Sequence, residues 1–215
     1  MYDVSWSSYL TAGTAVATVK EKRPSYNSTA YYIVAEGRPT PLLAKLYTLY
    51  YKVDTLVDST TLLPQRGSIY SEEGKRHRLQ VTQFDRAANK VLFRYQTETT
   101  IKSEFATSPV TQDVLSALYV LRALPLKPGD RMTMPISDNG INYKVQLDVA
   151  APERVKVPLG EISAWRFKPT VFDGNNQPVG RTMAIWVSDD ARRLPVKLQT
   201  DLPIGSFNLV LRDVR

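Results

Sequence analysis

The sequence predicts a mainly β protein: a single highly curved antiparallel sheet, a half-barrel or barrel-like meander, wrapped around one central α-helix at about residues 111–122. Three observations predict it. Apolar and polar residues alternate along most of the chain, turn residues separate the alternating runs, and one apolar segment has helical spacing instead. Because such alternation buries one side of an antiparallel sheet and exposes the other, we expect a two-faced sheet.

Two stretches of the chain carry the same turn sequence. Asp58 precedes Pro64 by six positions, Asp189 precedes Pro195 by the same spacing, and a glycine follows ten positions after each proline. An internal repeat of this kind predicts that one strand–turn–strand unit is used twice. Because proline cannot donate a backbone hydrogen bond, Pro64 and Pro195 are expected at strand starts or edges.

The alternating runs indicate about a dozen strands. Clear examples are residues 145–149, 165–167, 183–187 and 207–211, and turn sequences such as that at 138–140 lie between the runs. Because the connections are short, sequential strands are expected to pair as a meander.

The segment 111–122 breaks the alternation. Cap residues and Pro109 precede it, and Pro125 closes it, as at the two ends of a helix. Its residues are apolar almost all round, and a helix without a polar face must be enclosed. A sheet that curves around the helix would enclose it. A second short helical turn or irregular apolar segment is expected at 41–47.

One domain, residues 1–215, is expected because no Pro/Gly-rich or low-complexity linker interrupts the chain; a minor seam is possible near 125–130. No segment approaches the ~20 apolar residues that span a bilayer as a helix. The chain reads as a strand from its first residues and shows no signal peptide. We therefore expect it to begin at the boundary of a mature exported protein, with the signal peptide removed.

The reactive side chains provide no catalytic or metal-binding candidate. There is no cysteine, and the one histidine, His77, lies among basic residues in an expected hairpin. Glycine-rich phosphate loops and nucleophile motifs are absent from the sequence. No catalytic residue, metal site or cofactor is therefore predicted, and the protein is not expected to be an enzyme. Two distant carboxylates could still meet and act on a sugar.

The net charge of +7, from 28 basic and 21 acidic residues, is spread over both halves of the chain. A nucleic-acid-binding surface concentrates its basic residues, so no nucleic-acid partner is expected. The abundant aromatic residues could line an apolar pocket or pack between sheet and helix. The candidate ligand-binding residues are Leu115, Leu118, Tyr119, Trp165 and Trp186.

A family resemblance rests mainly on the segment from Trp186 to Lys197 and on Gly205 beyond it. The helix segment 113–119 and the opening residues 2–6 also fit. The chain resembles the bacterial domain-of-unknown-function family 3108, whose members are small exported proteins. More loosely, it is similar to periplasmic lipoprotein-carrier half-barrels. The first resemblance implies a mainly antiparallel β fold and a place in the periplasm or outer cell envelope of a bacterium, and it implies no catalytic residue.

Together these observations predict a non-enzymatic cell-envelope protein that binds a hydrophobic or lipid-like ligand in the concave face of its sheet. The basic excess would favour an anionic headgroup. One alternative is a structural or partner-binding envelope module without a ligand, which would expose an apolar patch at about 42–51. The third is a carboxylate-based hydrolase of cell-wall sugar.

Overall fold

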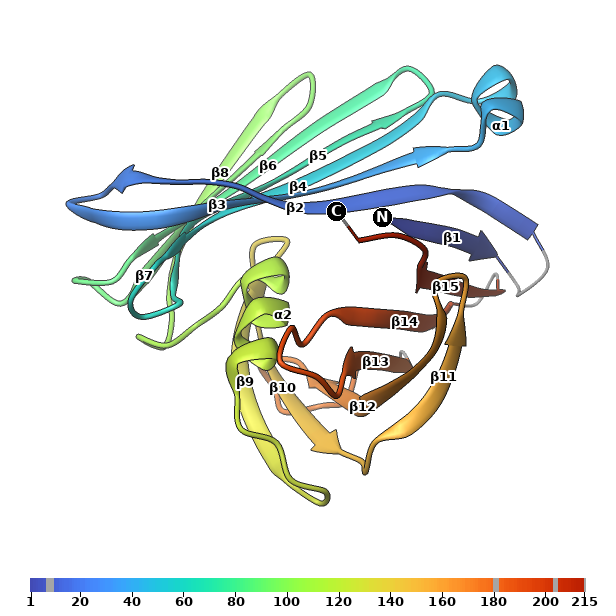
Figure 1. Ribbon diagram of the computed structural model, residues 1–215. Helices are drawn as coiled ribbons and strands as arrows, with labels where there is room; N and C mark the ends of the chain where they lie inside the picture. The colour runs from blue at the N-terminus through green and yellow to red at the C-terminus, as the bar shows by residue number, and fades with distance from the viewer. Residues whose placement is uncertain (7–9, 180–181, 203–204, 215) are drawn as a thin grey trace. The chain divides into compact units, whose positions relative to one another are not determined.

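The computed structural model describes residues 1–6, 10–179, 182–202 and 205–214. Within this part of the chain there are fifteen strands and two helices (Figure 1). The helices are α1 (Pro41–Leu46) and α2 (Val114–Ala123). The strands are β1 (Tyr2–Trp6), β2 (Leu10–Ser25), β3 (Ser28–Pro39), β4 (Leu49–Asp58), β5 (Pro64–Glu73), β6 (Arg76–Asp85), β7 (Lys90–Gln96), β8 (Thr100–Ala106), β9 (Arg131–Asp138), β10 (Ile141–Val149), β11 (Glu153–Val157), β12 (Gly160–Phe172), β13 (Met183–Ser188), β14 (Pro195–Leu202) and β15 (Gly205–Leu211).

The predicted mainly β, antiparallel architecture is confirmed. The strands belong to one sheet with the order β8-β7-β6-β5-β4-β3-β2-β1-β15-β14-β13-β12-β10-β9, and β11 pairs with β12. Most neighbours in the sheet are also neighbours in the chain, as a meander requires. The pairing of β1 with β15 joins the first and last strands. The wrapping of the sheet around a central helix stays a prediction.

Two compact units divide the chain. Unit 1 consists of residues 1–15, 121–134 and 144–215, and unit 2 consists of residues 16–120 and 135–143. Strands β2, β9 and β10 and helix α2 contribute residues to both units. The single domain over 1–215, with a minor seam at 125–130, stays a prediction.

Unit 2 contains strands β3 to β8, which lie side by side (Figure 1). Ile33 of β3 and Val57 of β4 form a buried cluster with Leu115 of α2. The start of α2 therefore packs on one face of this sheet. A second cluster consists of Phe84, Val91 and Phe93 of β6 and β7.

Helix α2 begins at Val114, three residues later than predicted. The backbone N–H of Gln112 donates to the carbonyl of Pro135, and the carbonyl of Gln112 accepts from the N–H of Ser137. Gln112 therefore pairs with an extended segment and cannot join the helix. Val114, the first residue of the helix, is 55% exposed, so the expectation that this helix is enclosed on all sides is wrong at that residue.

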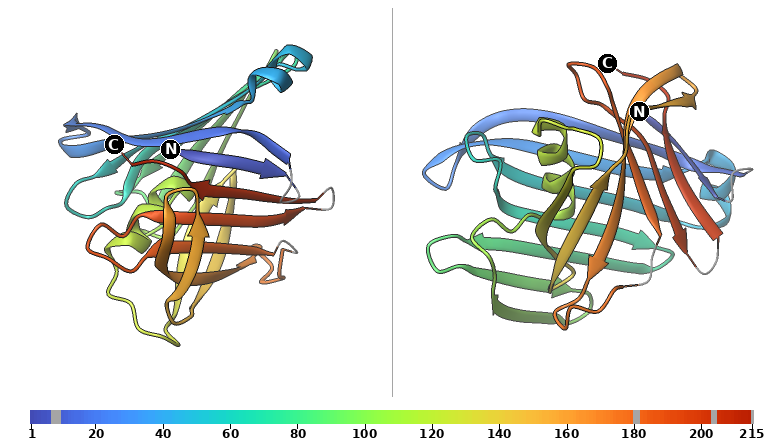
Figure 2. Two further views of the ribbon diagram at one scale, coloured as in Figure 1. Left: turned by 45° about the vertical axis from the view of Figure 1, so that its right-hand side comes forward. Right: turned by 90° about the horizontal axis from the view of Figure 1, so that it is seen from below.

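Unit 1 contains β11 to β15 and β1, with the adjoining parts of β2, β9 and β10. Figure 2 shows β12 to β15 side by side. The long strand β12 pairs through residues 160–164 with β11 and through residues 167–172 with β10. One strand edge thus carries two partners in succession.

The predicted repeat is present as two similar hairpins, one in each unit. Val57 pairs with Pro64 between β4 and β5, and Val187 pairs with Pro195 between β13 and β14. A register shift adjoins both pairs, and the residue two before each proline has a positive φ, 57° in the first turn and 48° in the second. Both prolines open a strand, as predicted.

An aspartate caps each repeated turn, but not at the same position. Asp58 Oδ1 accepts from the backbone N–H groups two and three residues later at 3.0 and 2.8 Å. In the second turn Asp190, rather than Asp189, makes the equivalent contacts, at 3.1 Å each. Hydrogen bonds, first among them the one from the backbone of Thr61, lower the pKa of Asp58 to about 2.

Candidate functional site

In unit 1, the strand register aligns apolar side chains from six strands. Residues that face each other across paired strands project from the same side of a sheet. Val149 of β10 lies opposite Phe167 of β12, and Phe167 lies opposite Ile185 of β13. Continued through β14, β15 and β1, the row consists of Val149, Phe167, Ile185, Leu198, Leu209 and Val4.

The same side of the sheet is apolar in the adjoining rows as well, apart from Thr200 of β14. We call this surface the apolar face. Besides the central row, it contains Val145, Leu147, Trp165, Val171, Met183, Val187, Phe207, Leu211, Tyr2 and Trp6.

Burial is uneven across the apolar face. Phe167 and Val187 are completely buried, whereas Leu198 and Leu209 are only partly buried and Trp6 is 36% exposed. The apolar surface on β14, β15 and β1 is therefore partly in contact with water. Apolar surface of this kind gains about 25 cal/mol per Å² when a ligand covers it.

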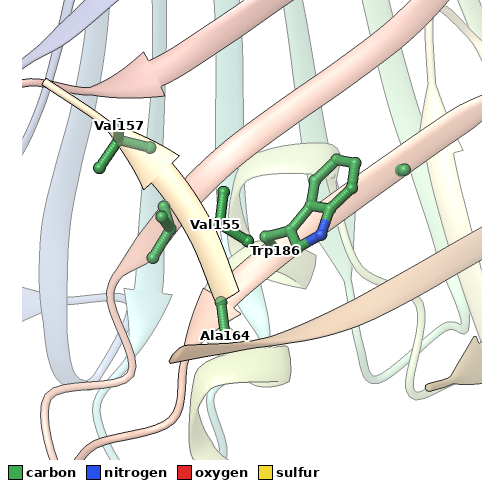
Figure 3. Close-up of a cluster of buried hydrophobic side chains, with 6 residues drawn as sticks. Val155, Val157, Ala164 and Trp186 are labelled. Atoms are coloured by element: carbon green, nitrogen blue, oxygen red, sulfur yellow. The ribbon is translucent and has the colours of Figure 1, made fainter. Parts of the chain in front are cut away.

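The opposite side of the same sheet, which we call the polar face, has a different composition. Arg166 of β12, Trp186 of β13 and Lys197 of β14 lie in one row on it. Strand β11 packs against part of this face through Val155 and Val157 (Figure 3). Its partners in this buried cluster are Ala164, Ala184, Trp186 and Val196.

Trp165 and Trp186 therefore lie on opposite faces of the unit 1 sheet. Trp165, on the apolar face, is 8% exposed and donates from Nε1 to Asp189 Oδ1 at 2.5 Å. The guanidinium of Arg193 lies 5.6 Å from the centre of its ring. The buried indole of Trp165 is thus satisfied as a donor, and its ring remains part of the apolar surface.

The other predicted binding residues lie on α2 in unit 2. Leu115 is buried against Ile33 and Val57, and Tyr119 packs against the same cluster. Leu118 is partly buried. The structure thus brings Leu115 and Tyr119 together, whereas Trp165 and Trp186 occupy separate surfaces. A ligand-binding role for any of the five stays a prediction.

Three residues of the row, Leu198, Leu209 and Val4, were not predicted from the sequence as site residues. Alternation already placed Leu209 in a strand, but alternation cannot show which strands are neighbours. The pairing of β1 with β15 completes the row, and it joins residues about 200 positions apart in the chain.

At the start of α2, Asp113 holds two elements of unit 2 together. Its Oδ1 accepts from the backbone N–H of Ser116 at 2.7 Å, and its Oδ2 accepts from Thr55 Oγ1 of β4 at 2.6 Å. Burial of the carboxylate raises the pKa of Asp113, and these hydrogen bonds oppose the rise. Asp113 therefore caps the helix and fixes it to the sheet.

Asp54, Asp113 and Asp138 all line a small cavity in unit 2. Burial also raises the pKa of Asp138. The cavity has a volume of about 30 Å³, and among its lining atoms Ser137 Oγ and Gln80 Oε1 are buried without a hydrogen-bond partner in the described part of the chain. This space suits about one water molecule and is far too small for a sugar ring.

Two larger grooves are open to solvent. One lies on the polar face of unit 1 and has a volume of about 650 Å³; the other lies in unit 2 and has a volume of about 540 Å³. Among the described lining residues, the first groove has one carboxylate, that of Asp201, and the second groove has one, that of Glu104. The paired carboxylates of glycoside hydrolysis are therefore not assembled in the described lining of either groove.

Among the residues that the structure describes, no three His, Asp or Glu side chains are grouped so that they could hold a metal ion. In the same residues, neither helix has the length and apolar character needed to cross a membrane.

The fold and its surfaces define an antiparallel β protein with one apolar and one polar sheet face in unit 1. The family DUF3108, described as proteins of unknown function, matches residues 1–212. The chain belongs to this family, which confirms the resemblance seen in the sequence. A search of curated proteins gives no match.

Two solved structures are similar to this chain, to different degrees. A β-barrel-like protein of family DUF1849 from Brucella abortus has 11% identity and a TM-score of 0.59, over 98% of this chain and 93% of that one. A DUF1089 family protein from Pseudomonas aeruginosa has 10% identity and a TM-score of 0.36, over 87% and 89% of the two chains. The first likeness shows the fold alone.

Proposed function

We propose that this chain is a non-enzymatic protein that holds a hydrophobic or lipid-like ligand against the apolar face of unit 1. The observation that carries the proposal is the continuous row of six apolar side chains across β10, β12, β13, β14, β15 and β1. The end of the row formed by Leu198, Leu209 and Val4 is only partly buried.

The energetic reason is the burial of apolar area. Each CH₂ group of an acyl chain that leaves water contributes about 0.8 kcal/mol. Partly exposed apolar side chains on three neighbouring strands offer such a chain a surface on which the Thr200 hydroxyl is the polar side-chain group to desolvate among the residues named above. The proposal retains the predicted curvature of the sheet around α2, which would make the ligand-binding face concave. Trp165 is the predicted binding residue that fits this surface in unit 1.

The proposal places the protein in the periplasm or outer cell envelope of a bacterium. Two observations support this location. The family resemblance implies export, and a chain without cysteine is suited to an oxidising compartment.

Mass spectrometry of organic extracts from the purified protein tests the proposal. We expect a co-purified lipid or other apolar molecule at a defined ratio to the protein. The variant Leu198→Gln, which places an amide on the partly exposed part of the apolar face, should lower that ratio. Leu159→Gln is the matched control, because Leu159 lies in a turn of unit 1 and is 44% exposed.

Two results would contradict the proposal. One is an extract without any apolar molecule, combined with no binding of added fatty acid. The other is equal ligand content in Leu198→Gln and Leu159→Gln, since the ligand would then lie elsewhere.

A second function, that of a partner-binding module, is supported by the exposed residues around α1. Leu42 is 71% exposed and Leu46 is 77% exposed, and the neighbouring Tyr47 and Tyr51 are 54% and 40% exposed. This patch lies within the 42–51 segment for which such a surface was predicted. Large apolar side chains grouped on a surface often mark an interaction site.

Cross-linking in envelope extracts would test this second function. A photoreactive residue at Leu46 should capture a partner if the α1 patch is the binding surface, and one at Ile101, which is 59% exposed on β8, should not. Equal capture from both positions would count against the α1 patch.

A further inference from the structure

The groove on the polar face of unit 1 has the features of an anion site. Its volume is about 650 Å³, and its described lining includes Arg166, Lys168, Trp186, Gln199 and Asp201. The register places Ala184, a small side chain, next to Trp186 along β13 and opposite Gln199 of β14. The small side chain of Ala184 therefore leaves space between the longer side chains that line the groove.

Two of the cations are held in place by the Trp186 ring. The guanidinium carbon of Arg166 lies 5.3 Å from the ring centre, and Lys197 Nζ lies 4.8 Å from it. The ring itself is fixed, because Trp186 is 5% exposed within the β11 cluster and donates from Nε1 to Glu153 Oε1 at 2.6 Å. Cation–π contacts to a buried indole thus orient two positive charges before any ligand arrives.

These cations lack the acidic partners that other basic residues of unit 1 have. Arg131 pairs with Asp148 at 2.7 Å, and Arg154 pairs with Glu161 at 3.2 Å. Within the described ranges, Arg166, Lys168 and Lys197 form no ion pair, and Arg166 Nε is buried without a hydrogen-bond partner. Because these cations have no acidic partner in that part of the chain, an anionic ligand in the groove would supply the missing counter-charge.

The acidic groups nearby restrict where an anion could sit. Asp201 lies two residues beyond Gln199 on β14, and its Oδ1 accepts from Ser206 Oγ at 2.6 Å. Glu153 is engaged at the edge of the Trp186 ring. Asp148 lies directly opposite Lys168 on β10, but its carboxylate is paired with Arg131. The end of the groove bordered by Arg166 and Lys168 is therefore more positive than the end bordered by Asp201.

We propose that this groove binds a multiply charged oxyanion of the phosphate class, held by Arg166 and Lys168 of its lining, with Lys197 adding positive charge from the other side of the Trp186 ring. Charge-assisted hydrogen bonds to oxyanions are among the strongest polar contacts in proteins, and arginine matches a phosphate group with two parallel donors. The site lies on the side of the sheet opposite the apolar face. Its ligand is therefore distinct from the one proposed there, and either proposal can fail without the other.

NMR spectroscopy of the ¹⁵N-labelled protein provides the test. The chain has three tryptophans, so three indole N–H signals report on Trp6, Trp165 and Trp186 separately. Titration with inorganic pyrophosphate should move the Trp186 signal saturably and leave the Trp6 signal in place. Sodium chloride at matched ionic strength should not reproduce the shift.

Variants connect the shift to the proposed residues. The double variant Arg166→Met, Lys197→Met should weaken pyrophosphate binding at least tenfold, because it removes both oriented charges. Lys168→Met, which changes an exposed side chain and leaves the Trp186 contacts intact, should also weaken binding and serves if the double variant fails to fold. Lys127→Met, at an exposed loop position of unit 1, removes one charge elsewhere and should leave binding unchanged.

The source of the phosphate group is resolved by a second arm. Co-sedimentation with phosphatidylglycerol vesicles but not with phosphatidylcholine vesicles, abolished by Lys168→Met, would assign a lipid headgroup. Pyrophosphate binding without co-sedimentation would assign a free phosphate compound. No Trp186 shift, a shift that sodium chloride reproduces, or equal weakening by Lys127→Met and Lys168→Met would overturn the proposal.

Discussion

Replacement of Asp113 by alanine tests whether this residue fixes α2 to the unit 2 sheet. The Asp113 carboxylate accepts hydrogen bonds from Ser116 N–H and Thr55 Oγ1, and both donor residues are fully buried. Loss of a helix cap costs about 1 kcal/mol. A buried donor left without its acceptor costs about 1–3 kcal/mol. We therefore expect Asp113→Ala to lower the free energy of unfolding by about 2–4 kcal/mol.

Asp113→Asn separates the hydrogen bonds from the charge. Its side-chain oxygen can still accept from Ser116, but it cannot ionise. Because burial raises the pKa of Asp113, the wild-type protein loses stability as pH rises from the unfolded value of about 3.9 through the raised folded value. The asparagine variant lacks this loss, so its stability relative to wild type should increase with pH.

Urea unfolding followed by circular dichroism, at about pH 4 and about pH 7.5, measures both effects. A free energy of unfolding for Asp113→Ala within about 0.5 kcal/mol of wild type would refute the capping role. A difference between wild type and Asp113→Asn that is the same at both pH values would refute the account of the charge.

Three further substitutions test the turns and the core by urea unfolding. Asp58→Ala should lower the free energy of unfolding by about 1–2 kcal/mol near neutral pH. Because the pKa of Asp58 is lowered to about 2, this stabilisation is complete above the unfolded pKa of about 3.9 and disappears as pH falls through about 2. A cost that persisted in stronger acid would contradict this explanation. Phe167→Ala, at a fully buried position of the apolar face, should cost about 3–5 kcal/mol, and a cost below about 1 kcal/mol would show a loosely packed site. Gly140→Ala should lower the free energy of unfolding more than Gly129→Ala. Both glycines have a positive φ (74° and 86°), but only at Gly140 would a new Cβ meet the Phe93 ring, at 2.8 Å. Equal costs would mean that the ring moves aside freely.

Local features of this fold could be predicted from the sequence because their causes are local. Pro64 and Pro195 open strands because a proline lacks the N–H that a central ladder requires. The repeated turn sequence produces two hairpins with the same register shift beside the proline. The sequence does not show that Asp190, rather than Asp189, caps the second repeated turn, since either residue can form a turn of this kind.

Features that depend on distant contacts were not predictable in the same way. The spacing around 111 suits a helix start, but Gln112 pairs with the backbone of residues 135–137 instead. Trp165 and Trp186 were grouped because both are large and apolar. Their odd and even positions on paired strands place them on opposite faces, and only the register of β12 with β13 shows this.

Titration with a fluorescent fatty acid such as cis-parinaric acid tests the central claim most directly, namely that the apolar face of unit 1 binds a hydrophobic ligand. The account predicts saturable binding by the wild-type protein and binding at least tenfold weaker after the double substitution Leu198→Gln, Leu209→Gln, with Leu159→Gln unchanged. No saturable binding by the wild type, or the same affinity in all three proteins while each remains folded, would contradict it.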